Sequence, residues 1–132
     1  MVQHWSIYLW VGLGSGLGGI GRLWVFSWMH HRFGVEFPWG TLTVNVIGSF
    51  VIGCFAAFTL PESRWILHPR FSLFFMAGFC GGFTTFSSFS MQTLELLQRG
   101  AWGYAVANMF SSLLLCLAAV AAGYYAGLWL NR

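Results

Sequence analysis

The stretch Gly78–Ser90 reads GFCGGFTTFSSFS and lies inside an apolar segment long enough to cross a membrane. Its adjacent glycines, Gly81 and Gly82, weaken a helix, and the hydroxyl groups within Thr84–Ser88 compete for the helical backbone hydrogen bonds. A helix interrupted in this way leaves carbonyl oxygens free, and such oxygens can coordinate a hard cation. The pattern therefore predicts a transmembrane helix that is broken mid-membrane and leaves carbonyl groups able to coordinate a cation.

Two phenylalanines of the same stretch, Phe86 and Phe89, are three residues apart and share a helix face. The edge of a phenyl ring carries partial positive charge, so two edges facing a pathway can replace part of the water around a small anion. The same rings can also serve only in lipid contact or core packing. The spacing alone leaves both interpretations open.

A second polar row is formed by Thr41, Asn45 and Ser49, which recur at every fourth position and therefore share a helical face. An amide inside an apolar segment costs free energy unless it forms hydrogen bonds. Asn45 can bond a neighbouring helix, or its NH₂ group can donate to an anion in a pathway. The sequence leaves both roles open.

The segment Gly12–Gly21, GLGSGLGGIG, contains glycines spaced as G-x-G-x-x-G. A dinucleotide site would need a preceding strand and a βαβ unit, and this apolar segment predicts neither. Small residues four positions apart instead predict close packing between helices. The pairs are Gly12 with Gly16 and Gly14 with Gly18. Arg22 ends the segment, either as an interfacial anchor or as a pore-mouth charge that attracts anions.

The elements that carry these residues are four apolar stretches, each near the ~20 residues that a helix needs to cross a bilayer. They are Trp5–Met29, Trp39–Leu60, Phe71–Leu97 and Ala101–Leu130, and all three prolines fall between them. The chain is 58% hydrophobic and only 7% charged, whereas soluble domains are about 25% charged. We therefore expect an all-α membrane protein with a single four-helix transmembrane domain over residues 1–132.

Other functional classes are disfavoured by what the sequence carries. The net charge of +3 is small and dispersed, which suits lipid headgroups better than nucleic acid. The four histidines are terminal or in loops, and no nucleophile–base pair or paired mid-span carboxylates occur. We therefore expect neither an enzyme nor a nucleic-acid-binding protein.

The arginines predict an unusual topology. Four spans place both termini and the loop near residues 62–70 on one side of the membrane. That side carries Arg64, Arg70 and Arg132, and the other carries Arg32, Arg99 and Arg22. Positive charge in cytoplasmic loops sets orientation, so an equal count predicts insertion in both directions. We therefore expect dual topology, with two copies packed antiparallel as a homodimer.

Taken together, these motifs resemble the Fluc (CrcB) family of fluoride-specific ion channels. The matching stretches are GGIGR in the first span, GTLTVNVIGSFVIG in the second, GFCGGFTTFSSFS in the third and LLQRG before the fourth. The resemblance implies an antiparallel dual-topology homodimer with two fluoride pathways and a central structural sodium ion that is not transported.

The resemblance also implies roles for single residues. Gly81 and Thr84 would bind sodium through their main-chain carbonyls, and Asn45 would be the pore asparagine. Phe86 and Phe89 would turn their rings to the ion. Hydroxyl groups along the pathway would come from Ser87 and Ser88. In the fourth span the remaining hydroxyl and amide groups are Asn108, Ser111 and Ser112, and of these we expect Ser112 to face the pore. Two features depart from the family: Gln92 replaces a common glutamate, and Cys116 and Val120 replace residues that tend to be serine or threonine.

The resulting hypothesis is a passive channel in the bacterial plasma membrane that lets fluoride leave the cell and lowers its cellular concentration. Fluoride would lose water on entry, and Asn45, the serines and the ring edges would replace that solvation. One alternative is a small antiparallel-dimer drug or cation exporter, which the lack of a deep carboxylate disfavours. The other is a non-conducting membrane accessory subunit.

Overall fold

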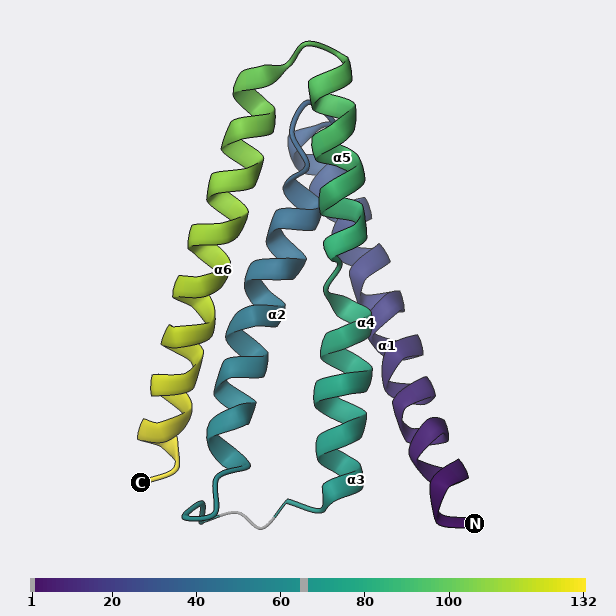
Figure 1. Cartoon of the computed structure of the whole chain (residues 1–132), viewed down its shortest axis with the longest axis vertical. Helices are drawn as coiled ribbons and strands as arrows, with labels where there is room; N and C mark the ends of the chain where they lie inside the picture. Colours follow the sequence, from purple (N-terminus) through teal and green to yellow (C-terminus); the bar gives the residue numbers. More distant parts are fainter. Residues whose placement is uncertain (1, 65–66) are drawn as a thin grey trace.

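The computed structural model describes residues 2–64 and 67–132, and within these ranges the chain is helical, with no strand (Figure 1). The long helices are α1 (Val2–Phe33), α2 (Trp39–Phe58) and α6 (Trp102–Leu130). Between α2 and α6 lie α3 (Pro69–Ser72), the π-helical segment η1 (Leu73–Cys80), α4 (Gly81–Phe83) and α5 (Phe86–Gln98). The segments α3, η1 and α4 follow one another without a gap and act as the first half of one long helix.

Short turns reverse the chain between the long helices. Gly34 and Gly100, with φ of +75° and +73°, follow the ends of α1 and α5, where a left-handed backbone favours glycine. Proline stands just before α2 at Pro38 and opens α3 at Pro69, as its missing N–H allows. Both chain ends and the turn after α2 lie at the same end of the molecule, so successive long helices alternate in direction (Figure 1).

Three helices are long and apolar enough to cross a membrane: Trp39–Phe58, Pro69–Gln98 and Trp102–Leu130. Three of the four expected spans are therefore confirmed within the described chain, whereas the expected first span, Trp5–Met29, is not among them. α1, with 32 residues, is long enough to cross a membrane. Its mean hydropathy is lowered by Arg22 and by the many glycines and tryptophans of the helix. With its several apolar spans, the chain is a multi-pass membrane protein.

The helices approach one another closely where glycines face a neighbouring backbone. A Cβ atom added at Gly14 or Gly18 would collide with the carbonyl oxygens of Phe74 and Phe79, respectively. α1 thus packs against η1 and α4 through the Gly14–Gly18 pair, as the small-residue spacing predicts. The predicted Gly12–Gly16 pair does not pack in this way, since nothing lies within 4 Å of either added Cβ.

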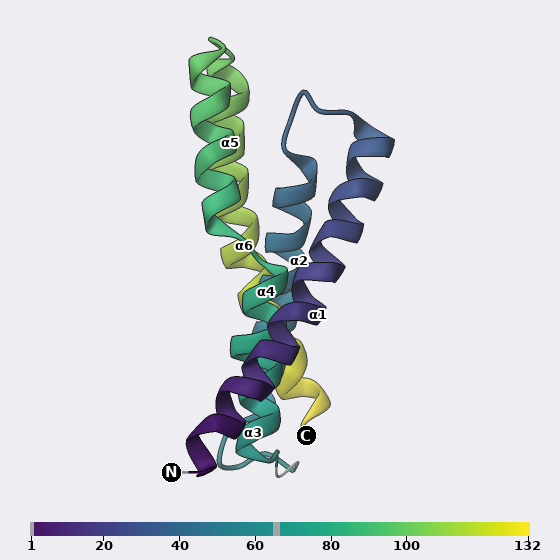
Figure 2. The ribbon, with the colours of Figure 1, turned by 90° about the vertical axis from the view of Figure 1, so that its right-hand side faces the viewer.

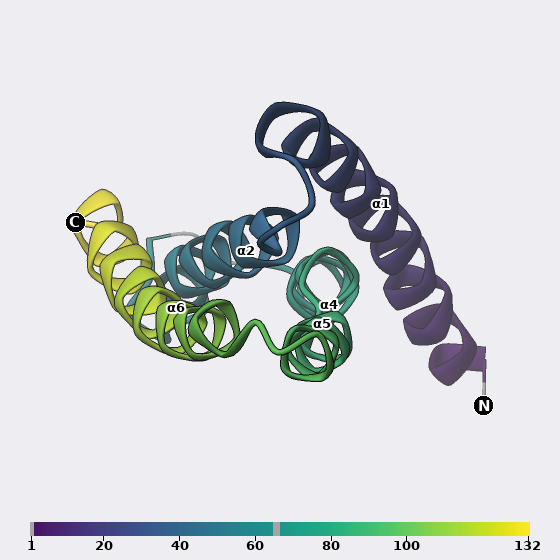
Figure 3. The same ribbon diagram turned by 90° about the horizontal axis from the view of Figure 1, so that it is seen from above.

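The order of the helices places the break at the centre of the molecule. Viewed from above, α2 lies between α6 and the broken helix, and α1 lies on the far side of the molecule from α6 (Figure 3). α5 runs beside the first part of α6, and α1 crosses near α4 (Figure 2). The junction between α4 and α5 is therefore within reach of α1, α2 and α6.

Candidate functional site

The chain leaves helical geometry at two residues, Thr84 and Thr85. α4 ends at Phe83, and the next two residues are extended, with φ/ψ of −83°/161° and −156°/112°. Both threonine side chains bond local backbone groups: Thr84 Oγ1 donates to the Cys80 carbonyl at 2.9 Å, and Thr85 Oγ1 accepts from Ser88 N–H at 3.2 Å. Thr85 is thus the N-cap of α5, and the two threonines explain locally why one helix ends and another begins.

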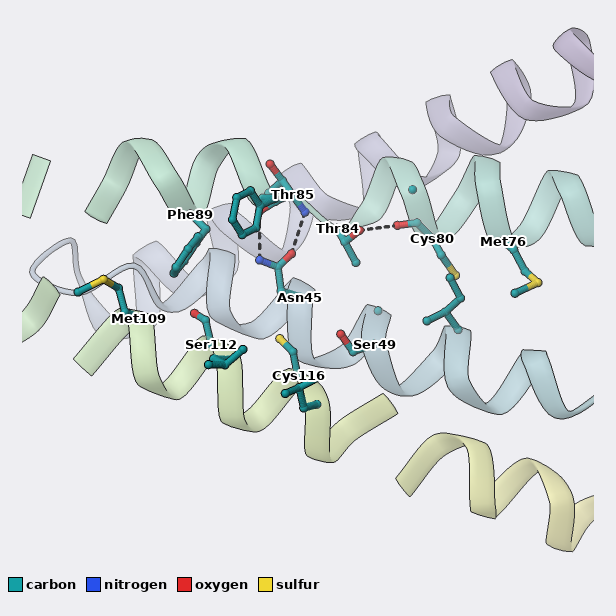
Figure 4. A pocket seen from close by; sticks show the side chains of 16 residues that line it. Asn45, Ser49, Met76, Cys80, Thr84, Thr85, Phe89, Met109, Ser112 and Cys116 are labelled. Carbon is teal, nitrogen blue, oxygen red and sulfur yellow. Dashed lines mark hydrogen bonds between the residues drawn. The ribbon is translucent and has the colours of Figure 1, made fainter. Parts of the chain in front are cut away.

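Asn45 of α2 bonds the backbone at the interruption of the helix (Figure 4). Its Oδ1 accepts from the backbone N–H of Thr85 at 2.7 Å, and its Nδ2 donates to the Thr85 carbonyl at 3.1 Å. One side-chain amide therefore satisfies both backbone groups of a residue that is only 6% exposed. This pairing realises the interhelical hydrogen bond considered for Asn45, and it leaves the second Nδ2 hydrogen available.

A groove of about 570 Å³ lies against this break, between α2, α6 and the broken helix. Six of the residues selected from the sequence line it: Asn45, Gly81, Thr84, Phe86, Phe89 and Ser112. Its walls are otherwise largely apolar, with sulfur atoms from Met76, Cys80, Met109 and Cys116 (Figure 4). The polar groups in this wall are few and lie near the break, as in a site that binds one small ligand.

The two phenylalanines differ in their exposure. Phe86 is 78% exposed, whereas Phe89 is partly buried, and their ring centroids are 5.3 Å apart with planes tilted by 43°. Both rings line the groove. Phe86 therefore makes little contact within its own chain, which leaves its edge free for an ion or a second molecule.

The two residues expected to bind a cation have carbonyls that the break releases. In an uninterrupted helix, Thr85 N–H would bond the Gly81 carbonyl and Ser88 N–H the Thr84 carbonyl. The first amide bonds Asn45 instead, and the second bonds the Thr85 hydroxyl. No group of three or more histidine, cysteine or acidic side chains in the described part of the chain could hold a metal ion.

Arg22 of α1 reaches the same break. Its guanidinium Nη1 lies 3.5 Å from the Thr84 carbonyl oxygen, and its side chain is not among those that line the groove. The charge expected at a pore mouth thus stands beside a carbonyl released by the break. A carbonyl oxygen has two lone pairs, so this contact uses one acceptor position of Thr84.

Ser87 and Ser88 are not among the groove-lining residues. Their hydroxyl groups lie 3.2 and 3.0 Å from Thr85 Oγ1, and so they form a small cluster around the N-cap of α5. Farther along α5, Gln92 accepts a hydrogen bond at 2.6 Å from Thr41, a side chain that is 1% exposed. The amide that replaces the family glutamate therefore still accepts a hydrogen bond.

Ser49 shares its helical face with Asn45 in the polar row of α2, and no role was predicted for it. It lines the groove one helical turn from Asn45 (Figure 4), and its hydroxyl forms no hydrogen bond within residues 2–64 and 67–132. The i, i+4 spacing was the signal for it. The apolar lining residues, such as Met76 and Leu117, gave no such signal, because nothing distinguishes them from residues that face lipid.

Comparison with known proteins identifies a family for this chain. Residues 9–124 match the model of a family described as CrcB-like protein, Camphor Resistance (CrcB). The chain belongs to the CrcB-like family. The match covers the glycine-rich part of α1, the polar row of α2, the break and most of α6.

Several relatives of this CrcB-like chain match nearly its whole length. A protein of Opitutus terrae is 51% identical over 126 residues, which cover 96% of both chains. Proteins of Methylocella silvestris and Rhodospirillum rubrum are 46% and 44% identical over 125 residues, or 95% of this chain. Each of the three is named fluoride-specific ion channel FluC. The family resemblance inferred from the motifs is therefore confirmed.

Proposed function

We propose that this CrcB-like protein is a fluoride-specific ion channel through which fluoride leaves the cytoplasm passively, so that its cellular concentration falls. The observation that carries the proposal is the groove at the helix break, where six residues expected to handle ions meet. The identity of the ion rests on the names of relatives that match nearly the whole chain. A channel of this kind performs no chemical reaction, and its residues act by solvating the ion.

The groove offers a dehydrated anion several partial positive charges. Among the residues that the structure describes, one Nδ2 hydrogen of Asn45 and the hydroxyl of Ser49 have no partner, and both can donate to it. The edges of Phe86 and Phe89 add a weaker attraction without competing hydrogen-bond acceptors. Because each contact is individually weak, the ion can enter the groove and leave it again, which conduction requires.

The residues present fit a structural sodium ion at the break. The carbonyls of Gly81 and Thr84 are released from the helical ladder and are hard oxygen ligands. An added Cβ at Gly81 would meet only the Met76 carbonyl, at 4.0 Å, so this face is open. A bound sodium would supply positive charge and join carbonyls from two copies, so that two ligands per chain become four around the ion.

A second copy would complete the site as an antiparallel homodimer. Phe86 is 78% exposed and the surface at Gly81 is open, so residues on both sides of the break are uncovered within one chain. Three arginines lie toward the end with the termini and two toward the other, with Arg22 beside the break, so the charge bias is small and permits insertion in both orientations. In this arrangement α1 also crosses the membrane, which brings the number of spans to four. The break lies mid-membrane, and the protein resides in the bacterial plasma membrane.

The direct test uses purified protein in liposomes loaded with potassium fluoride. Valinomycin supplies the counter-ion current, and a fluoride electrode reports release. The proposal expects rapid fluoride release that needs no proton gradient, with no comparable release of chloride. Release that depends on an imposed proton gradient would favour an exporter, and no release would favour an accessory subunit; either result would contradict the channel.

A further inference from the structure

A chain of buried hydrogen bonds connects the groove wall on α6 with the backbone that carries Phe89. Thr93 Oγ1 donates to the Phe89 carbonyl at 2.7 Å, and Asn108 Nδ2 donates to Thr93 Oγ1 at 2.9 Å. Ser112 Oγ lies 3.5 Å from Asn108 Oδ1 and closes the chain at the groove. Asn108 is 0% exposed, so its amide depends entirely on these neighbours.

The number of available hydrogens fixes the direction of every link. A carbonyl only accepts, so the single hydroxyl hydrogen of Thr93 goes to Phe89. Thr93 Oγ1 must then accept from Nδ2 of Asn108, which turns Oδ1 toward Ser112. Since an amide oxygen also only accepts, a hydrogen bond between Ser112 and Asn108 is donated by the Ser112 hydroxyl, whose hydrogen then points away from the groove.

The last link is the one that an ion can break. At 3.5 Å it is longer and therefore weaker than the links of 2.7 and 2.9 Å behind it. An anion attracts hydrogens, so Ser112 can bind it only by turning its hydrogen away from Asn108. Within the described chain no other group donates to Asn108 Oδ1, and a buried acceptor without a donor is costly.

We propose that Asn108 is a positioning residue that holds the Ser112 hydrogen while the groove is empty and thereby weakens the binding of an anion there. This inference rests on the proposed channel function. Binding that is too tight would slow release, so the resting partner of Ser112 favours rapid passage. Asn108 itself touches no ion and acts through Ser112.

The test compares the fluoride concentration that gives half-maximal release from liposomes for four proteins. They are wild type, Asn108→Leu, Ser112→Ala and the double variant. Ser112→Ala removes the donor and should raise the half-maximal concentration. Asn108→Leu frees the Ser112 hydrogen and should lower this concentration by about threefold or more, with a lower maximal rate. In the double variant, the leucine should cause no further shift, because no hydroxyl remains to be released.

The opposite directions of the two single variants separate positioning from simple damage to the fold. An equal shift by Asn108→Leu with and without Ser112 would overturn the role of Asn108. If that variant does not fold, Ser112→Ala decides alone, and an unchanged half-maximal concentration overturns the proposal. If the wild type releases fluoride normally and the variants leave the half-maximal concentration unchanged, only this inference is contradicted. If the wild type releases no fluoride, the proposed channel function is contradicted as well.

Discussion

At the scale of the residue, Asn45 makes the interhelical hydrogen bond that was one of its two predicted roles, and the proposed channel would give it the second role as well. Its amide pairs with both backbone groups of Thr85, which the broken helix would otherwise leave without partners. It also lines the groove and retains one hydrogen for an ion. The side chain that holds the break is therefore positioned, by the same bonds, to face the proposed pathway.

Asn45→Leu should both destabilise the protein and slow fluoride release by about tenfold or more, because two buried backbone groups lose partners, each worth about 1–3 kcal/mol. Thermal unfolding and liposome release measure the two effects. Ser49→Ala is the matched control, since Ser49 lines the same groove without a hydrogen bond and its loss should leave the unfolding temperature unchanged. An Asn45→Leu protein with wild-type stability and release would contradict both roles.

The phenylalanines can be tested as sources of charge rather than of volume. Replacing both Phe86 and Phe89 by leucine keeps apolar contact but removes the ring quadrupole, so release should fall about tenfold or more if ring edges solvate fluoride. Phe110→Leu is the control, because Phe110 is 60% exposed and does not line the groove. A stable double variant with unchanged release would show that the rings only pack.

At the scale of the element, glycines decide which helix faces meet. On α1, Gly14 and Gly18 face the backbone of η1 and α4, while Gly12 and Gly16 face open space. On the other side of the molecule, Gly53 of α2 stands against the carbonyl of Val120 in α6. The broken helix is thus held at a short distance from α1, which brings Arg22 within reach of Thr84.

Gly18→Ala should strongly reduce the yield and thermal stability of folded protein, because the new methyl group would collide with the Phe79 carbonyl in a backbone-to-backbone contact. Gly16→Ala, two residues away on the same helix, should be tolerated, since nothing lies within 4 Å of its added Cβ. Size-exclusion profiles and unfolding temperatures compare the two variants. Equal damage from both would mean that close approach at Gly18 is not the cause.

The break itself should depend on sodium. Complete replacement of sodium by a large organic cation should lower the unfolding temperature or stop fluoride release, because the released carbonyls of Gly81 and Thr84 lose their proposed partner. Thr84→Ser should keep the sodium response, since the carbonyl and a hydroxyl both remain. Equal stability and release with and without sodium would show that these carbonyls are satisfied in another way.

At the scale of the whole molecule, the distribution of charge and the open break both point beyond one chain. Both termini lie at the same end of the helices (Figure 1), so each copy presents Arg64, Arg70 and Arg132 at that end. The opposite end carries Arg32 and Arg99, while Arg22 lies beside the break. The two ends therefore differ by one arginine, which is a weak bias for orientation. Antiparallel copies would bring two exposed breaks together.

Dual topology predicts that a tag at the C-terminus is accessible from both sides of the membrane in intact cells. Two arginines added to the turn between α5 and α6 should shift the population toward a single orientation, with that turn in the cytoplasm. Accessibility of the tag to an impermeant reagent, before and after permeabilisation, measures the ratio. Labelling of wild-type C-termini from one side only would contradict the hypothesis.

Much of this protein is encoded locally and could be predicted from the sequence. Runs of apolar residues predict helices, since a helix satisfies its own backbone in a bilayer. The Gly81–Gly82 pair followed by threonines indicates the position at which the chain departs from helical geometry. The i, i+4 spacing of Asn45 and Ser49 predicts their common face, because it depends only on the helical repeat.

Only the tertiary structure decides which partners these residues meet. Asn45 bonds a residue 40 positions away, and Arg22 reaches one 62 positions away, so both contacts depend on how whole helices pack. Ser87 and Ser88 lie outside the groove, and their hydroxyls are beside Thr85 Oγ1 at the N-cap of α5. Asn108 and Ser112 stand four residues apart in the sequence, but the direction of their hydrogen bond is set by Thr93 on another helix. Helical periodicity depends only on the local sequence, whereas the donor that bonds each acceptor depends on which helices pack together.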